Sequence, residues 1–498
     1  MDSVRDAEAS SDSDEVVVYR DARSDELTFD SGSFRDRTAR VFFHQGEVFR
    51  ALSMQALNEW RQVSGEPYFQ QLLSSGRVVP TEQLTEQQIQ QLQLPLKAAA
   101  ILRHQRIPFV TYPYEWSFSM LQDAALLHLE ILTEAIKVGT ILKDSSPYNV
   151  QFCGTRPVFI DVGSFVSHAT GEPWAGYRQF CELMLFPLLL QAYRKIDVQP
   201  VLRVKLDGIS AAEFLRPLAW RDMLRPGVFT HGWLQSVLER QASTVETDTI
   251  GVLKSSGFDR SLIQNNLKQL TRLIRRLKWT PANNQWSNYR HDKPHVVRDV
   301  QAKQRFVAEV CQARRRSLVW DLGCNDGHFS QIAAAHANTV IAMDQDHGCV
   351  ERLYCKLVTD KTHQNIVPLC IDLLNPSPAL GWRGRERLRL ENRGQPELIL
   401  CLGLIHHLVI AGNIPLPEVV DWLASLQAEV ILEFPSKRDP MVKSLLRHKH
   451  DQYDDYSLAA LEVALANRAF QIQKRIELPS GDRTLLFLTP NQSVAGDA

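Results

Sequence analysis

The stretch Val319-Trp320-Asp321-Leu322-Gly323-Cys324-Asn325-Asp326-Gly327-His328-Phe329 decides how the C-terminal part of this chain folds. Residues 317–322 have the apolar character of a buried strand, and a helix is expected from His328 to His336. The turn between them contains Gly323 and Gly327, and glycine lets the backbone come close to a ligand. In a parallel α/β sheet such a turn lies at the carboxyl edge, where ligands bind. The stretch therefore predicts a ligand site.

A second strand supports the same interpretation. Residues 338–343 are mostly apolar and end in Asp344, about twenty residues after the glycine turn. At this spacing a carboxylate meets the two hydroxyls of a bound ribose. Asn325 stands between the two glycines, and asparagine is the residue other than glycine that best tolerates a positive φ. We therefore expect the turn to bind a nucleoside.

Strands and helices alternate after residue 316, which predicts a doubly wound, Rossmann-like α/β sheet with its ligand crevice at the strand ends. The expected strands are residues 317–322, 339–344, 366–371, 398–402, 430–434, 471–477 and 484–488. The last two are joined by residues 478–483, a connection too short for a crossover helix. They should therefore pair as a terminal antiparallel hairpin.

These residues resemble motif I of the class I S-adenosylmethionine-dependent methyltransferases, usually Asp/Glu-x-Gly-x-Gly-x-Gly, over roughly residues 300–490. Such methyltransferases carry a terminal hairpin that dinucleotide dehydrogenases generally lack, and the dehydrogenase motif Gly-x-Gly-x-x-Gly is missing here. The resemblance implies S-adenosylmethionine as cofactor. It places Asp321 and Gly323 at the methionine moiety, Asp344 at the ribose and Asp372 at the adenine amine. The implied cofactor-binding set is Asp321, Gly323, Asn325, Gly327, Asp344, Asp372 and Leu402.

The fourth expected strand is followed by Gly403-Leu404-Ile405-His406-His407, which resembles motif IV of small-molecule methyltransferases. The resemblance places His406 and His407 where the methyl group is delivered. If the acceptor is a hydroxyl, a histidine suits the role of general base. Alternatively, both histidines shape the pocket floor. Residues 381–389 are rich in arginine and form either a basic rim over the crevice or an exposed helix face. No metal is expected in this domain.

The overall arrangement is also similar to bacterial nodulation-related methyltransferases, which implies a small-molecule or saccharide acceptor. Two other functions stay open at this point. One is a bifunctional kinase-methyltransferase, and the other is a non-catalytic scaffold protein that binds the cofactor as a structural ligand.

The N-terminal half contains a second group of polar residues. Residues 40–43 and 48–52 predict a β-hairpin, and residues 121–138 predict an amphipathic helix. Asp144, Asn149 and Asp161 follow with a spacing that weakly resembles the catalytic and metal loops of protein-kinase-like folds. That resemblance implies ATP, with Mg²⁺ at Asn149 and Asp161. The glycine-rich phosphate loop is missing, and Arg50 is the nearest candidate for the ATP-binding lysine. Alternatively, these residues form turns and caps.

Composition limits the class of protein. The chain has 498 residues, a net charge of −1 and eight scattered cysteines, which predicts several cytoplasmic domains with no nucleic-acid partner. The longest apolar run is too short to cross a membrane. The expected divisions are an acidic disordered tail at 1–35, an α+β domain at 36–240 that resembles a kinase-like fold, a helical linker at 241–300, the methyltransferase domain at 301–490 and a tail at 491–498.

Overall fold

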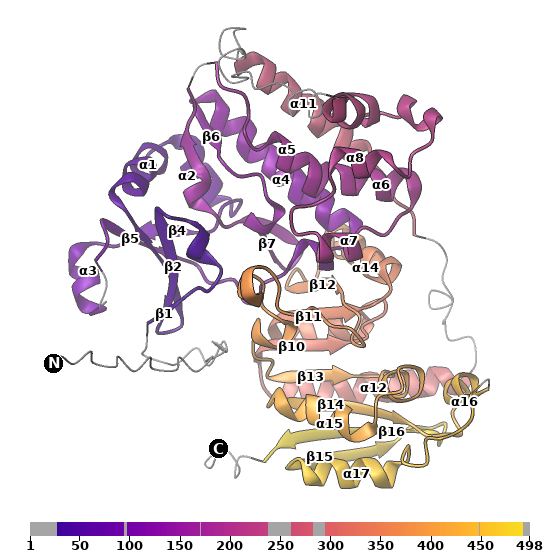
Figure 1. Ribbon diagram of the computed structural model, residues 1–498. Helices are drawn as coiled ribbons and strands as arrows, with labels where there is room; N and C mark the ends of the chain where they lie inside the picture. The colour runs from indigo at the N-terminus through magenta and orange to yellow at the C-terminus, as the bar shows by residue number, and fades with distance from the viewer. Residues whose placement is uncertain are drawn as a thin grey trace, which may run out of the picture.

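The computed structural model describes residues 27–93, 97–169, 171–237, 260–281, 294–447 and 449–491. Two sheet-containing halves lie against each other, with the C-terminal half in orange and yellow in Figure 1. Residues 1–26 of the predicted tail 1–35, residues 492–498 of the predicted tail 491–498 and much of the predicted linker lie outside the described residues. No helix of the described ranges has both the length and the apolar character that a membrane crossing requires.

The N-terminal half begins with an antiparallel sheet in the order β1-β2-β3-β5-β4. Its strands are β1 (Thr28–Phe29), β2 (Ala39–His44), β3 (Glu47–Leu52), β4 (Thr81–Gln83) and β5 (Ala100–His104). The predicted hairpin is confirmed as β2 and β3, joined at Gln45 and Gly46, which both have a positive φ. The expectation of a disordered tail up to residue 35 is wrong for its last part, because β1 pairs with β2.

Helices and two short sheets complete this half. The long helix α4 (Phe118–Lys137) is confirmed and is buried along most of its length, because its apolar residues face β8 and the later helices. The short strands pair as β6 (Thr140–Leu142) with β9 (Phe165–Ser167) and β7 (Val150–Cys153) with β8 (Arg156–Phe159). The other α-helices are α1 (Met54–Ser64), α2 (Pro67–Ser74), α3 (Glu86–Gln91), α5 (Tyr177–Phe180), α6 (Phe186–Arg194), α7 (Gln199–Val204), α8 (Ala211–Leu215) and α11 (Arg260–Arg276).

The C-terminal sheet has seven strands in the order β12-β11-β10-β13-β14-β16-β15. Five are parallel: β10 (Arg316–Leu322), β11 (Ala337–Asp344), β12 (Ile366–Cys370), β13 (Leu398–Cys401) and β14 (Glu429–Pro435). The last two, β15 (Phe470–Glu477) and β16 (Arg483–Pro490), pair antiparallel with each other, and β16 pairs antiparallel with β14. The doubly wound sheet with a terminal hairpin is therefore confirmed.

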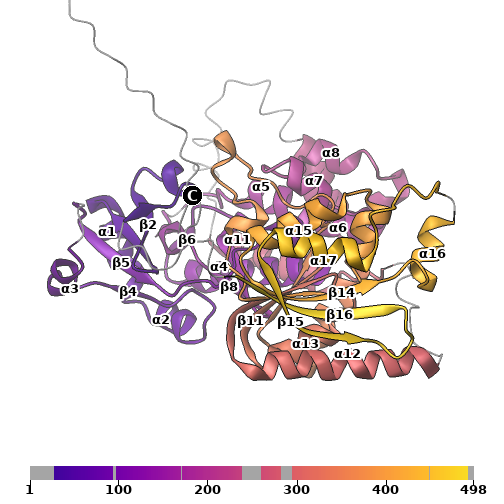
Figure 2. The same cartoon turned by 90° about the horizontal axis from the view of Figure 1, so that it is seen from below.

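Helices cover both faces of this sheet. Figure 2 shows α12 (Pro294–Ala313) and α13 (His328–Ala334) below the sheet and α15 (Leu416–Ser425) and α17 (Leu458–Asn467) above it. Two further helices, α14 (His347–Asp360) and α16 (Pro440–Leu446), follow β11 and β14. On the α12 side, Phe306, Val307 and Val310 pack with Val319 of β10 in one apolar cluster. Helix α12 crosses the expected boundary at residue 300 and belongs to the sheet domain.

The two halves share one apolar core, which runs from α4 into β10 and β12. At its edge, Glu115 and Arg393 form a two-pronged ion pair, with N–O distances of 2.6 and 2.7 Å and both side chains buried. At another contact between the halves, a Cβ on Gly154 would lie 1.4 Å from the carbonyl oxygen of Gln364, so only glycine fits there. The halves therefore pack as closely as the interior of a single domain.

The arginine-rich segment at residues 381–389 belongs to this contact. The backbone N–H of Leu388 donates to the Tyr112 hydroxyl at 2.6 Å, and the Arg387 guanidinium lies 4.0 Å from the centre of the Tyr148 ring. The expectation of a basic rim over the crevice is wrong, because this segment contacts the N-terminal half.

Replacing Arg393 by methionine should lower the free energy of unfolding by roughly 3–5 kcal/mol, since Glu115 would stay buried without its cation. Chemical denaturation followed by tryptophan fluorescence measures the change. The double variant Glu115→Gln/Arg393→Met should recover most of the loss, because it leaves no unpaired charge. Arg475→Met, in an exposed ion pair with Glu462, should cost about 1 kcal/mol or less. A single Arg393→Met variant as stable as that control would contradict the role given to the buried pair.

Candidate active site

A cavity of about 990 Å³ lies at the carboxyl edge of the C-terminal sheet. Loops that follow β10, β11, β12 and β13 contribute to it together with Glu433 of β14, as expected for a parallel sheet. Of the nine residues predicted for cofactor binding and catalysis, eight line this one cavity: Asp321, Gly323, Asn325, Asp344, Asp372, Leu402, His406 and His407. The fold therefore brings the residues predicted at four strand ends together in one cavity.

The turn after β10 is held against β11. The N–H groups of Gly323 and Cys324 both donate to the Met343 carbonyl, at 2.8 and 2.9 Å. Gly323 has a φ of 74° and Asn325 a φ of 50°, so the asparagine takes the left-handed conformation that its place in the motif requires. These conformations turn the loop backbone toward the cavity.

Gly327 is the predicted cofactor residue that does not line the cavity. Its φ is 73°, and a Cβ at this position would lie 2.5 Å from Leu353 Cδ1 on α14. The glycine therefore permits close packing of the turn against α14. Its contact with the ligand stays a prediction, because the structure places it against α14 and not among the residues that line the cavity.

Asp344 fixes the turn from the end of β11. Its carboxylate accepts hydrogen bonds from the Asn325 and Asp346 N–H groups, both at 2.8 Å. Asp346 in turn caps α14 by accepting from the N–H groups of Gly348 and Cys349. Burial raises the pKa of Asp344 above its ordinary value, and the two backbone hydrogen bonds oppose this shift. A bound polar ligand would find a carboxylate already oriented by the backbone.

Asp321 lies deeper, at 2% exposure, where the Ser330 hydroxyl donates to it at 2.5 Å. Burial raises the pKa of Asp321 to about 7, and the nearby charge of Asp344 adds to the shift. A cation placed beside this group would stabilise its ionised form. Asp372 is exposed at the rim and accepts from the Leu374 N–H at 2.9 Å, and Leu402 follows β13 at the cavity wall.

His406 and His407 begin the helical turn after β13, and their ring centres are 4.1 Å apart. Burial first, and then the neighbouring His407, lower the pKa of His406 to about 2. Burial also lowers the pKa of His407, and the positive charge of Arg483 adds to this effect. Both imidazoles are therefore neutral near pH 7 and are chemically able to accept a proton.

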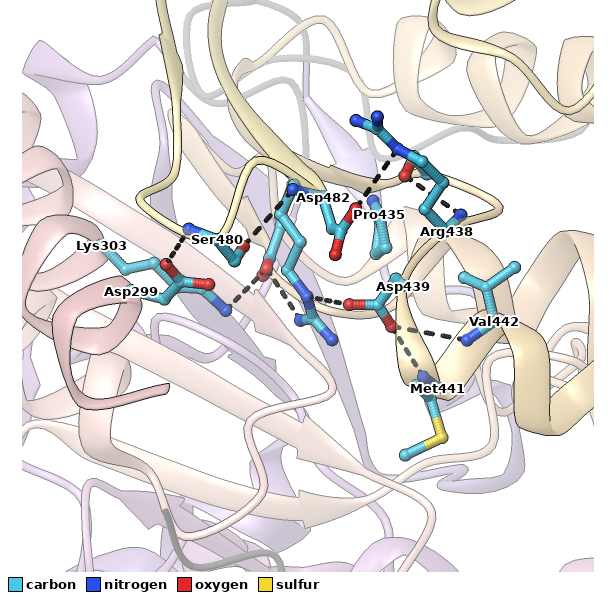
Figure 3. A network of polar contacts seen from close by, with 12 residues as sticks. Asp299, Lys303, Pro435, Arg438, Asp439, Met441, Val442, Ser480 and Asp482 are labelled. Carbon is cyan, nitrogen blue, oxygen red and sulfur yellow. Dashed lines mark hydrogen bonds and ion pairs between the residues drawn. The ribbon is translucent and has the colours of Figure 1, made fainter. Parts of the chain in front are cut away.

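The structure adds an ionic cluster that sequence reasoning did not assemble (Figure 3). Glu433, at the end of β14, contacts Lys303 at 2.6 Å and Arg483 at 2.9 Å, and all three line the cavity. Arg483 also pairs with Asp439 at 2.7 Å. Lys303 and Arg483 come from α12 and β16, so no local pattern in the sequence links them to Glu433.

The N-terminal half supplies part of the cavity wall. Lys195 and Asp197, which follow α6, and Trp279 and Pro281, which follow α11, are among its lining residues. A Cβ on Gly348 would lie 2.9 Å from the Pro281 Cβ, so the segment closes tightly over the start of α14. No motif in the sequence predicted this contribution, since it depends on how the two halves pack.

Asp144, Asn149 and Asp161 lie outside this cavity, in the loops around β7 and β8. The Ile160 N–H donates to the Asn149 carbonyl at 2.8 Å. Burial raises the pKa of Asp144, and the nearby charge of Asp161 contributes to the same shift. The Asp161 carboxylate is bound by Arg50 at 2.8 Å. The adjoining cavity, of about 10 Å³, has room for about one water molecule. In the part of the chain that the structure describes, three or more His, Cys, Asp or Glu side chains do not gather as a metal site would require.

Several known proteins resemble this chain, although no protein-family model matches it. Magnesium protoporphyrin IX methyltransferase (ChlM) from Synechocystis PCC 6803, solved with bound SAH, is 17% identical over 41% of this chain and 91% of its own, with a TM-score of 0.30. The N-methyltransferase NodS from Bradyrhizobium japonicum WM9, also with SAH, is 16% identical over 42% of this chain and 94% of its own, again with a TM-score of 0.30.

These likenesses give no support to the kinase-like interpretation of the N-terminal half.

A curated relative matches both halves of the chain. The nodulation protein NoeA of Rhizobium meliloti (strain 1021) is 34% identical over 458 residues, which cover 91% of this chain and 94% of NoeA. On this identity and coverage, the chain belongs to the family of the nodulation protein NoeA.

Proposed function

We propose that this protein is a class I methyltransferase that transfers a methyl group from S-adenosylmethionine to a small molecule or a saccharide. The observation that carries the proposal is the arrangement of three carboxylates. Asp321 and Asp344 lie at the ends of β10 and β11, Asp372 follows β12, and all three line the same cavity. They have the order and spacing that the methyltransferase motif requires for the methionine, ribose and adenine parts of the cofactor.

The charge of the cavity supports a cationic ligand. Its described lining residues include seven carboxylates and three Lys or Arg side chains. A cleft with such an excess of negative charge attracts cations and repels anions. S-adenosylmethionine carries both a sulfonium and an ammonium group. The same field disfavours an acceptor with a phosphate or carboxylate near the methyl group.

When bound, S-adenosylmethionine would supply a methyl group already activated by its positive sulfur. The protein then has to hold the acceptor in line and exclude water. Asp321 and the Gly323 turn would hold the methionine end, while Asp344 would accept hydrogen bonds from the ribose. His407 is our candidate to take the proton that a hydroxyl acceptor loses, because the pKa of about 2 makes His406 the weaker base. His406 would then form the pocket wall.

Phosphoryl transfer by the N-terminal half is not favoured. Arg50 already neutralises Asp161, and the cavity that Arg50 lines is far too small for a nucleotide. The remaining alternative is a scaffold protein that binds the cofactor without turnover. Methylation of a fractionated extract with radiolabelled S-adenosylmethionine distinguishes the two, because a scaffold protein would bind the cofactor and label nothing.

Replacing Asp344 by alanine should weaken the binding of S-adenosylhomocysteine at least about tenfold, because hydrogen bonds to a charged group contribute ~1.5–3 kcal/mol. Isothermal titration calorimetry measures the affinity. Asp360→Ala is the matched control, since Asp360 is an exposed aspartate at the far end of α14. Unchanged affinity in Asp344→Ala would refute the ribose assignment.

The affinity should also depend on pH through Asp321. Its pKa is about 7 in the free protein, and a bound ammonium would lower it, so binding below pH 7 must release a proton. Affinity for S-adenosylhomocysteine should therefore rise as the pH increases from about 5.5 to 7, with a smaller rise in Asp321→Asn because Asp344 remains. Calorimetry in buffers of different ionisation enthalpy counts the released protons. A wild-type affinity that is flat over this range would contradict the assignment of the amine to Asp321.

A further inference from the structure

The acceptor end of the cavity contains a buried carboxylate that the cofactor assignment leaves unused. Glu433 has 0% exposure at the end of β14 and lines the cavity next to His406 and His407. Its Oε1 accepts from Lys303 and Arg483, whereas Oε2 has no hydrogen-bond partner among the described residues. A buried charged oxygen without a donor is costly, so a ligand group that donates to it would be bound favourably.

Oε2 faces the loop where the methyl group would be delivered. A Cβ on Gly403 would lie 3.7 Å from it, and Gly403 begins the loop that continues to His406 and His407. The φ of Gly403 is 61°, which favours glycine, so no side chain at this position covers Oε2. A group bound to Oε2 would therefore lie beside the two histidines.

The carboxylate is ionised and fixed in place. Although burial opposes its charge, Lys303 and Arg483 outweigh that effect and lower the pKa of Glu433 to about 2. Arg483 is itself held by Asp439, which accepts from the Met441 and Val442 N–H groups at the start of α16. Two cations and two carboxylates balance one another, so the cluster presents a rigid acceptor of hydrogen bonds rather than a net charge (Figure 3).

We propose that Glu433 binds the methyl acceptor through Oε2 and selects acceptors that present a hydroxyl or amino group, as neutral and cationic saccharides do. A phosphate or carboxylate at this point has no hydrogen to donate, so it would leave the ionised Oε2 unpaired and would be disfavoured. This inference rests on the proposed function and adds to it the class of acceptor and the residue that selects it.

The test uses the full chain saturated with S-adenosylhomocysteine and three tetrasaccharide probes of different charge. These are cellotetraose, a glucosamine tetramer and tetragalacturonate. Calorimetry and saturation-transfer NMR measure binding. We expect the neutral and cationic tetramers to bind and the anionic one to be excluded. Glu433→Gln should weaken saccharide binding at least about tenfold and leave the affinity for S-adenosylhomocysteine unchanged.

Asp439→Asn is the matched control, because it removes the other carboxylate of the same cluster without removing the oxygen that faces the cavity. It should keep saccharide binding within about threefold of wild type. Equal binding by Glu433→Gln, equal binding of tetragalacturonate, or no binding of any tetramer would overturn the assignment of Glu433. A wild-type protein that does not bind S-adenosylhomocysteine would instead overturn the proposed function itself.

Discussion

The parallel pairing of β10 with β11 and β13 is the constraint on which the site depends. In this arrangement the strands end at the same edge, so residues 21 or more positions apart in the chain become neighbours. Asp344 then completes the turn after β10 by accepting the Asn325 N–H at 2.8 Å. The same carboxylate that we assign to the ribose thus also shapes the loop that would bind the methionine part. Loop shape and ligand recognition are coupled through one side chain.

The second requirement is the tight contact between the two halves. The buried pair of Glu115 and Arg393 lies between them, and residues after α6 and α11 complete the wall of the cavity. The N-terminal half is therefore part of the site, whatever other activity it has. The polar residues of that half that resemble a kinase site do not form an open site, since Arg50 already neutralises Asp161. We infer that in this protein the N-terminal half serves to build and close the cavity.

Much of the C-terminal fold could be predicted from the sequence because its signals are local. Apolar strands, the glycine turn and the short 478–483 connection each encode their own structure, and the sheet confirms them. What could not be predicted depends on contacts distant in sequence. Gly327 packs against α14, and the arginine-rich segment at 381–389 contacts Tyr112 and Tyr148. Lys303 reaches Glu433 of β14 from helix α12. None of these contacts leaves a pattern in a short window of residues.

The most direct test of the account is a crystal structure of the full chain with S-adenosylhomocysteine. We expect density for the ligand in the cavity at the carboxyl edge, with the ribose hydroxyls on Asp344 and the methionine amine near Asp321. The sulfur should point toward His407 and Glu433. A ligand bound elsewhere, or one in this cavity whose ribose does not contact Asp344, would contradict the central claim that this sheet edge is built to hold the cofactor.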